Sequence, residues 1–203
     1  MNIAVRITQQ AEADALLSRS ALALLVGALL DRQIPTESAF AAPATIAWRL
    51  GCEDLDADRI AWHDPGHLAA LFAARPAVHA YPEVMARRVQ ELCRHLVARH
   101  GGRASAVWEG VATGRDLYRR VSELPGFGRQ KTQIFVALLA KQYGVRPDGW
   151  REAAGVYGED GVYRSVADVT GPQSLARVRE YRQEEGRAAK EARSRPAGQR
   201  QRL

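Results

Sequence analysis

Cysteine is nearly absent from this chain of 203 residues, in which only Cys52 and Cys93 occur. Two cysteines are too few for a disulfide framework, a four-cysteine zinc site or an iron–sulfur cluster, and they favour a compartment where thiols stay reduced. Long hydrophobic runs are lacking as well: the longest, Ala21 to Leu30, is too short to span a bilayer. The N-terminal residues Met1 to Arg6 do not resemble a secretory signal. We therefore expect a cytoplasmic protein without a membrane partner.

Lysine is also scarce, since three of the 29 basic residues are lysine and the other 26 are arginine. A GC-rich genome produces such a bias by itself, so the arginine excess is weak support for nucleic-acid binding. The formal net charge is +6, but residues 177–203 alone hold nine basic and four acidic side chains. The rest of the chain is close to neutral, so any surface on it that binds nucleic acid must be a local patch.

Apolar residues recur at helical spacing through most of the chain, which predicts an all-α protein. The segment from Leu16 to Leu29 is apolar on nearly every side, so it belongs in the interior as a helix or a helix pair. The helix that opens at Tyr81-Pro82 and stops at Gly101 is amphipathic. Further expected elements are helices at 114–123 and 129–143, a short helix capped by Asp148, a weak strand-like alternation at 155–171, and a charged helix from Arg177 that fades into a disordered tail.

The stretch Leu124-Pro125-Gly126-Phe127-Gly128 separates two of these helices. Glycine at 126 and 128 lets the chain turn sharply and leaves the turn without side chains on its surface. The amides of the turn and of the next helical turn, at Arg129, Gln130 and Lys131, then point outward without acceptors. Such amides favour a phosphate, and residues 115–131 carry five basic against two acidic side chains. The plain alternative is a glycine-containing turn with a solvated basic face.

Residues 124–132 resemble the hairpin of the helix-hairpin-helix DNA glycosylases, the superfamily that includes endonuclease III. The signature of that superfamily continues with a loop containing glycine and proline and then an essential aspartate, a pattern matched here by Gly144, Pro147 and Asp148. The run Leu25 to Gln33 is similar to the early barrel helix of these enzymes, whose last turn bears a glutamine that often faces DNA. The likeness extends from Leu16 to about Trp150.

The resemblance implies a six-helix barrel beside a second helical lobe, with DNA across the cleft between them. The barrel would comprise residues 32–142 and include the helix-hairpin-helix motif at 115–142. The second lobe would be built from both chain ends, residues 1–31 and 143–176. Residues 177–203 would form a charged helix and a basic tail outside both lobes, where they could add nonspecific DNA affinity.

The activity implied by the resemblance is base-excision repair: a damaged or mispaired nucleotide is flipped out of double-stranded DNA and its N-glycosidic bond is hydrolysed. Asp148 would be the catalytic residue, because an ionised carboxylate stabilises the oxocarbenium character of the sugar and orients the attacking water. Its alternative role is that of a helix cap only. Gln130 stands where family members with lyase activity carry the nucleophilic lysine, so we expect a monofunctional enzyme. Lys131, about 100° further round the helix, would contact phosphate instead.

Three further residues are candidates for the base pocket, each with a plainer reading. Gln33 would fill the gap left by a flipped base, or it simply ends a helix. Asp31 would be a second pocket carboxylate, or a polar residue at a helix terminus. Trp150 would stack on a base, or it belongs to the core. We expect no metal site, since His63 and His67 lack a third ligand.

The functional expectation is therefore a cytoplasmic, nucleoid-associated DNA glycosylase that acts as a monomer on double-stranded DNA. No cofactor is expected, and no iron–sulfur cluster, although a monovalent cation at the hairpin is compatible with the motif. One alternative is a noncatalytic helix-hairpin-helix protein that kept the DNA-binding turn and lost the chemistry. A further alternative is a helical scaffold that does not touch DNA. The lesion itself depends on pocket residues brought together from distant segments.

Overall fold

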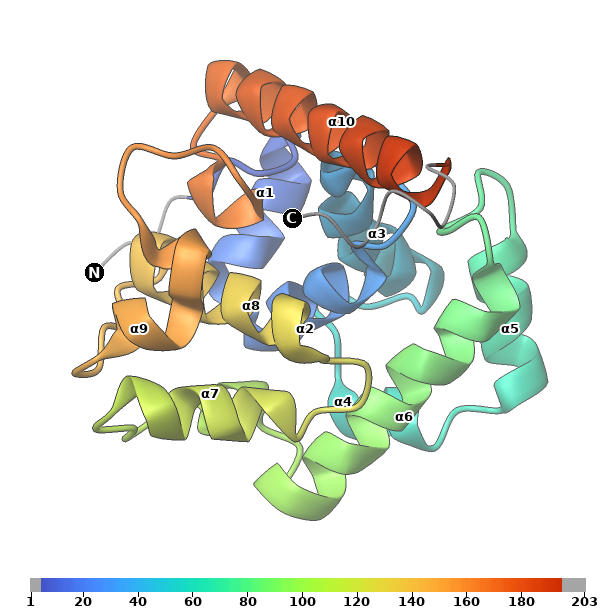
Figure 1. Cartoon of the computed structure of the whole chain (residues 1–203). Helices are drawn as coiled ribbons and strands as arrows, with labels where there is room; N and C mark the ends of the chain where they lie inside the picture. The colour runs from blue at the N-terminus through green and yellow to red at the C-terminus, as the bar shows by residue number, and fades with distance from the viewer. Residues whose placement is uncertain (1–4, 195–203) are drawn as a thin grey trace.

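The computed structural model describes residues 5–194, in which every regular element is a helix and no strand occurs (Figure 1). The predicted all-α class is confirmed. The α-helices are α1 (Ala11–Arg19), α2 (Ala21–Leu30), α3 (Thr36–Arg49), α4 (Ala57–Ala61), α5 (Pro65–Ala73), α6 (Pro82–His100), α7 (Gly114–Ser122), α8 (Arg129–Gln142), α9 (Trp150–Ala154) and α10 (Pro172–Ser194). Three short 3₁₀ helices join them: η1 (Ala104–Val107), η2 (Gly155–Gly158) and η3 (Val166–Asp168). The expected tail beyond residue 194 lies outside the described residues.

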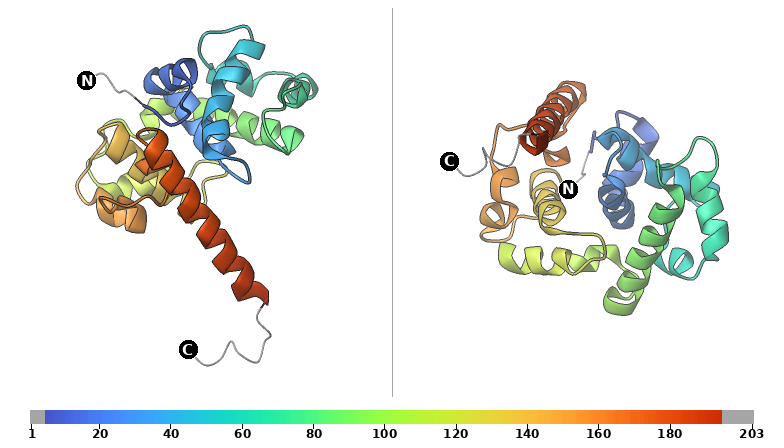
Figure 2. Two further views of the ribbon diagram at one scale, coloured as in Figure 1. Left: turned by 90° about the horizontal axis from the view of Figure 1, so that it is seen from above. Right: turned by 45° about the vertical axis from the view of Figure 1, so that its right-hand side comes forward.

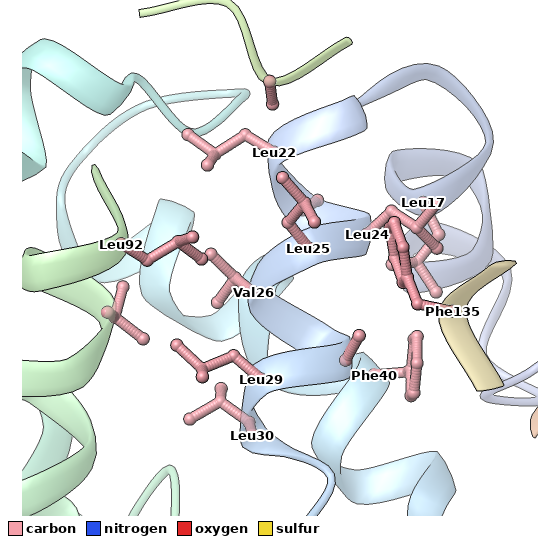
Figure 3. Packing of buried hydrophobic residues seen from close by; sticks show 14 of the residues in the cluster. Leu17, Leu22, Leu24, Leu25, Val26, Leu29, Leu30, Phe40, Leu92 and Phe135 are labelled. Carbon is pink, nitrogen blue, oxygen red and sulfur yellow. The ribbon is translucent and has the colours of Figure 1, made fainter. Parts of the chain in front are cut away.

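Helix α2 lies at the centre of the core, as its apolar surface on all sides predicts. Every residue of α2 except Ala21 is buried. Figure 3 shows Val26 and Leu29 on the side toward Leu92 of α6, and Leu24 on the side toward Leu17 and Phe135. Gly27 lets α3 approach closely, because a Cβ there would lie 2.8 Å from Cδ1 of Phe40. The helical conformation is interrupted at Ser20, between α1 and α2. The side chain of Ser20 caps α2 by accepting a hydrogen bond from the amide of Ala23.

Local signals in the sequence set several of the other helix boundaries. Helix α6 starts with proline in its first turn and ends at Gly101 in the left-handed conformation, both as predicted. Thr113 caps α7 by accepting a hydrogen bond from the amide of Asp116. The strand-like alternation at 155–171 was a wrong indication: Ser165 and Asp168 cap each other in η3, and the segment turns instead of extending. Helix α10 begins at Pro172, five residues before the predicted start.

A single hydrophobic cluster joins α1 through α9 with η1, η2 and η3, so both expected lobes share one core. The division of the chain into a barrel and a second lobe stays a prediction. Helix α10 is attached differently, through a small separate cluster of Val169, Leu175 and Val178 with Tyr163. Its C-terminal half extends away from the other helices (Figure 2). Among the described residues no single helix is both long and apolar enough to cross a membrane; α1 and α2 meet that criterion only as a pair, across a bend of 116°.

Candidate nucleic-acid interface

The turn between α7 and α8 is the tight hairpin that the sequence predicts. Leu124 and Phe127 anchor it in the core, and the amide of Phe127 donates to the carbonyl oxygen of Leu124 over 3.1 Å. Gly126 has φ +85°, a conformation that glycine adopts without strain, and a Cβ there would lie 2.4 Å from Cδ1 of Leu29. A Cβ on Gly128 would meet nothing within 4 Å. The outer surface of the hairpin is therefore bare backbone that a ligand can approach.

The N-terminus of α8 follows directly from this bare turn. Gly128 is the N-cap and contributes no side chain, and the first amide of the helix that finds an internal acceptor is that of Thr132, which donates to the Gly128 carbonyl over 2.9 Å. The amides of Arg129, Gln130 and Lys131 have no backbone acceptor within residues 5–194. Their free N–H groups and the dipole of a 14-residue helix make this end suitable for an anion.

A cavity of about 600 Å³ opens beside the hairpin. It is lined by the loop Asp31–Gln33 after α2 and, from the hairpin and the start of α8, by Gly126, Gly128 and Arg129–Lys131. Tyr157 and Arg164 also line it, and so do Arg182 and Glu185 of α10. The structure thus brings seven of the nine predicted site residues to one hollow: Asp31, Gln33, Gly126, Gly128, Arg129, Gln130 and Lys131.

Gln33 lines this cavity from a loop with an unusual backbone conformation. It is exposed and has φ +60°, a left-handed conformation that is uncommon for a residue with a side chain. The loop is held in place next to it, because the carbonyl oxygen of Arg32 lies 2.8 Å from Nε2 of the buried His79. Glutamine is thus presented toward solvent at a fixed point. That position is compatible with the predicted insertion into a base stack, which stays a prediction.

Lys131 does not point out toward a phosphate, which corrects the sequence-based expectation for its side chain. Its Nζ donates to the carbonyl oxygens of Ala28, of Leu29 at 3.2 Å and of Asp31 at 3.3 Å, and so caps the C-terminus of α2. These carbonyls are the orphan acceptors of a helix end, and an ammonium group satisfies three of them at once. Burial lowers the pKa of Lys131 to about 8, although Asp31 acts in the opposite direction.

A titration of the lysine side chains is expected to isolate this group, because the chain has only three lysines. In ¹³C-lysine NMR spectra, the Lys131 signal should titrate with a pKa near 8. The lowered pKa means that the protonated form destabilises the folded state; this cost is present below pH 8 and disappears as the pH rises toward the unfolded pKa of about 10.4. Unfolding free energy should therefore rise from pH 8 to 10 relative to Lys131→Met. A Lys131 signal that titrates at the unperturbed value would contradict the placement.

Asp31 is held by an arginine from the distant helix α10. The two terminal nitrogens of Arg182 donate to the two carboxylate oxygens of Asp31 over 3.0 and 2.8 Å, and Arg182 also donates to Oγ1 of Thr36. One turn earlier on α10, Arg179 pairs with Glu37 at 2.5 Å. These two ion pairs fasten α10 to the start of α3 and to the loop before it, so that α10 forms part of the cavity wall.

Removing one partner of the Asp31–Arg182 pair is expected to destabilise the protein. The Asp31 side chain is 9% exposed and that of Arg182 is 32% exposed, so solvent screens the pair only partly. We expect Asp31→Ala to lower the unfolding free energy by about 1–3 kcal/mol, which chemical denaturation measures. A double-mutant cycle with Arg182→Ala should give a coupling, whereas the exposed pair Arg87–Glu91 should give almost none. Equal coupling in both pairs would show that the Asp31 contact contributes no more than a surface pair.

Asp148 lies outside the cavity, contrary to the expected geometry. It is exposed and runs beside Thr113, with its amide donating to the Ala112 carbonyl over 3.2 Å and its carbonyl accepting from the Gly114 amide over 2.7 Å. These contacts place it at the start of α7, whereas the hairpin follows the end of that helix, about 13 Å away along the axis. Asp148 does not cap α9 either, because Gly149 occupies that position and no side chain caps it.

Trp150 belongs to the core, in agreement with its plainer reading. It is 7% exposed, and the guanidinium of Arg151 covers its ring at 4.5 Å. Near it lies a second, shallower hollow of about 330 Å³, whose walls include Arg115, Tyr118 and Gly149. Arg129 borders both hollows and therefore stands on the ridge between them.

Two arginines at the cavity, Arg32 and Arg129, have no carboxylate partner within the described residues, whereas Arg164 and Arg182 are ion-paired with Glu159 and Asp31. The contributions of Arg182 and Tyr157 to the cavity were not predicted from the sequence. Their only sequence signal is residue type, since their contacts span 151 residues from Arg182 to Asp31 and 27 residues from Tyr157 to Gln130.

No family model matches the chain, and no curated protein or solved structure matches it with significant similarity.

Proposed function

We propose that this protein is a base-excision DNA glycosylase that hydrolyses the N-glycosidic bond of a flipped, damaged or mispaired base. The observation that supports this proposal best is that one cavity is lined both by the bare glycine hairpin and by the exposed Gln33. A phosphate of the DNA backbone binds the amides at the start of α8, and Gln33 enters the stack. A nucleotide extruded between these two contacts is directed into the cavity.

The chemistry requires a carboxylate near the extruded sugar, to stabilise its oxocarbenium character. Asp31 and Glu185 line the cavity, while Asp148, the candidate from the sequence, does not. Comparing Asp31→Asn, Glu185→Gln and Asp148→Asn therefore identifies the acting group. Loss of excision in Asp148→Asn alone would show that the DNA sugar lies near the start of α7, and loss in Asp31→Asn or Glu185→Gln would place it in the cavity.

The test is excision from a panel of duplexes. Duplexes carrying uracil, a thymine mismatch, an oxidised purine or an alkylated base are incubated with the protein and cleaved with alkali. Cleavage at one of these bases is the expected result. Duplex binding without release of any base would contradict the enzymatic proposal for that panel, and absence of salt-sensitive binding to any duplex would contradict DNA binding itself.

Borohydride trapping is expected to yield no covalent adduct with an abasic-site duplex. Gln130 cannot act as an amine nucleophile, and the amine of Lys131 already donates to three carbonyl oxygens. Mass spectrometry of the trapped reaction checks this expectation. An adduct mapped to Lys131, whose pKa is lowered to about 8, would show that the enzyme also acts as a lyase.

A noncatalytic DNA-binding protein is the second candidate, and one observation favours it. The carboxylate of Asp31 is engaged by Arg182 on both oxygens, and Asp148 lies outside the cavity, so neither is poised for chemistry there. The excision panel separates the two candidates, since both predict salt-sensitive binding to duplexes and only the glycosylase releases a base.

A further inference from the structure

We propose that Tyr157 and Gln130 select the base, and that they favour a neutral base with a carbonyl group next to an N–H over a cationic alkylated base. This inference rests on the proposed function and names the substrate class of the same cavity. It is carried by two independent observations, which are the hydrogen-bonding pair on the cavity wall and the charge of the cavity lining.

The pair consists of one rigid and one adaptable side chain. Nε2 of Gln130 donates to the hydroxyl oxygen of Tyr157 over 2.8 Å, and both residues line the cavity. The hydroxyl proton of Tyr157 and the amide oxygen of Gln130 have no partner within the described residues. The pair therefore presents a donor beside an acceptor. If the amide were turned over, its N–H would donate and the hydroxyl oxygen would accept, so the pattern holds in both orientations.

Buried apolar side chains also line this cavity. Phe40, Phe135, Leu138 and Val166 line the cavity, and all four are at most 1% exposed. When a base moves from water into this cavity, its apolar faces are buried. The polar groups on its edge then need hydrogen-bond partners in the cavity, because an unpaired buried polar group is unfavourable. The pair Tyr157–Gln130 can satisfy a carbonyl and an adjacent N–H together, whereas methylation of that N–H leaves one group of the pair without a partner.

The charge of the lining points the same way. Five basic side chains line the cavity, Arg32, Arg129, Lys131, Arg164 and Arg182, against the two acidic ones, Asp31 and Glu185. A cavity with this excess of positive charge attracts carbonyl oxygens and repels a base that carries a positive charge after alkylation. Uracil, hypoxanthine and oxidised purines belong to the favoured class, and 7-methylguanine belongs to the disfavoured class.

Binding to duplexes that resist cleavage tests the pair without requiring catalysis. Uracil and 3-methyluracil are placed on 2′-fluoro-arabinose sugars opposite an abasic site, so that neither base has a pairing partner. Fluorescence anisotropy should show the wild type binding the uracil duplex about tenfold more tightly than the 3-methyluracil duplex. Tyr157→Phe and Gln130→Leu should each reduce this ratio to near one. Tyr81→Phe, a matched change of an exposed tyrosine outside the cavity, should keep the full ratio.

The outcomes distinguish this inference from the proposed function. Duplex binding without discrimination in the wild type, or discrimination that survives both variants, overturns the role of the pair and leaves DNA binding intact. Failure to bind any duplex contradicts the proposed function; the pair is then decided by NMR with free 1-methyluracil and 1,3-dimethyluracil. A shift of the Gln130 side-chain amide with 1-methyluracil only supports the pair, and equal or absent shifts overturn it.

Discussion

Replacing Gly114 with valine is expected to lower the unfolding free energy by more than about 3 kcal/mol. A Cβ at this position would lie 2.4 Å from the carbonyl oxygen of Gly149 and 2.6 Å from Cα of Trp150. Both obstacles are backbone atoms, so no side-chain rotation relieves the clash. The start of α7 would have to separate from the segment 148–150, and the hydrogen bond between the Gly114 amide and the Asp148 carbonyl would be lost.

Chemical denaturation followed by circular dichroism measures this effect. Gly171→Ala is the matched control, because a Cβ there meets nothing within 4 Å and its backbone is not left-handed. Because Gly171 is the residue before α10, where alanine is less favourable than glycine, we expect the control to lower stability by no more than about 1 kcal/mol. A small effect of Gly114→Val would show that α7 and the segment 148–150 can separate at little cost, and the position derived for Asp148 would then be wrong.

Reversing the charge of Arg129 is expected to weaken duplex binding by about tenfold or more at moderate salt. Arg129 is the first residue of α8, borders both hollows and has no carboxylate partner within the described residues. Arg129→Glu removes a cation from the proposed phosphate site and places an anion beside the exposed amides. Loss of one phosphate contact should also lower the slope of log K against log salt by about 1.

The control for this variant is Arg103→Glu, which changes the net charge by the same amount. Arg103 is paired with Glu109 at 3.0 Å and borders neither hollow. Its affinity for duplex and its slope of log K against log salt should stay near the wild-type values. Fluorescence anisotropy over a series of salt concentrations measures both. Equal losses in the two variants would mean that net charge, and not the hairpin, governs binding.

The elements of the fold that the sequence predicted best are those set by local chemistry. The apolar residues from Leu16 to Leu29 correctly predicted that α2 lies in the interior. Gly101, Thr113 and the glycines of the hairpin correctly predicted helix ends and a turn, because the conformation at such a position depends only on adjacent residues. The same is true of the exposed amides at the N-terminus of α8. They follow from Gly126, Gly128 and the geometry of any helix N-terminus.

The details that depend on long-range packing were not predictable from the sequence. Lys131 was expected to face outward, but helix α2 ends within its reach, 103 residues away in sequence, and supplies three carbonyl acceptors. Gly144, Pro147 and Asp148 follow the hairpin in the order that resembles the superfamily signature, yet the contact with Thr113 holds Asp148 away from the cavity. The role of α10 as a cavity wall depends on ion pairs between distant segments, which spacing does not reveal.

The separate packing of α10 has a consequence for the sequence of unfolding events. Because its apolar contacts form a small cluster of their own and its remaining anchors are ion pairs, α10 can detach while α2, α6 and α8 keep their shared core. Its amides should exchange with deuterium through a low-energy local opening, and those of α2 only through global unfolding. The cavity would then lose the wall that α10 forms and become wider, while the hairpin stays intact. The width of the cavity is therefore set by a local opening whose free energy is far smaller than that of global unfolding.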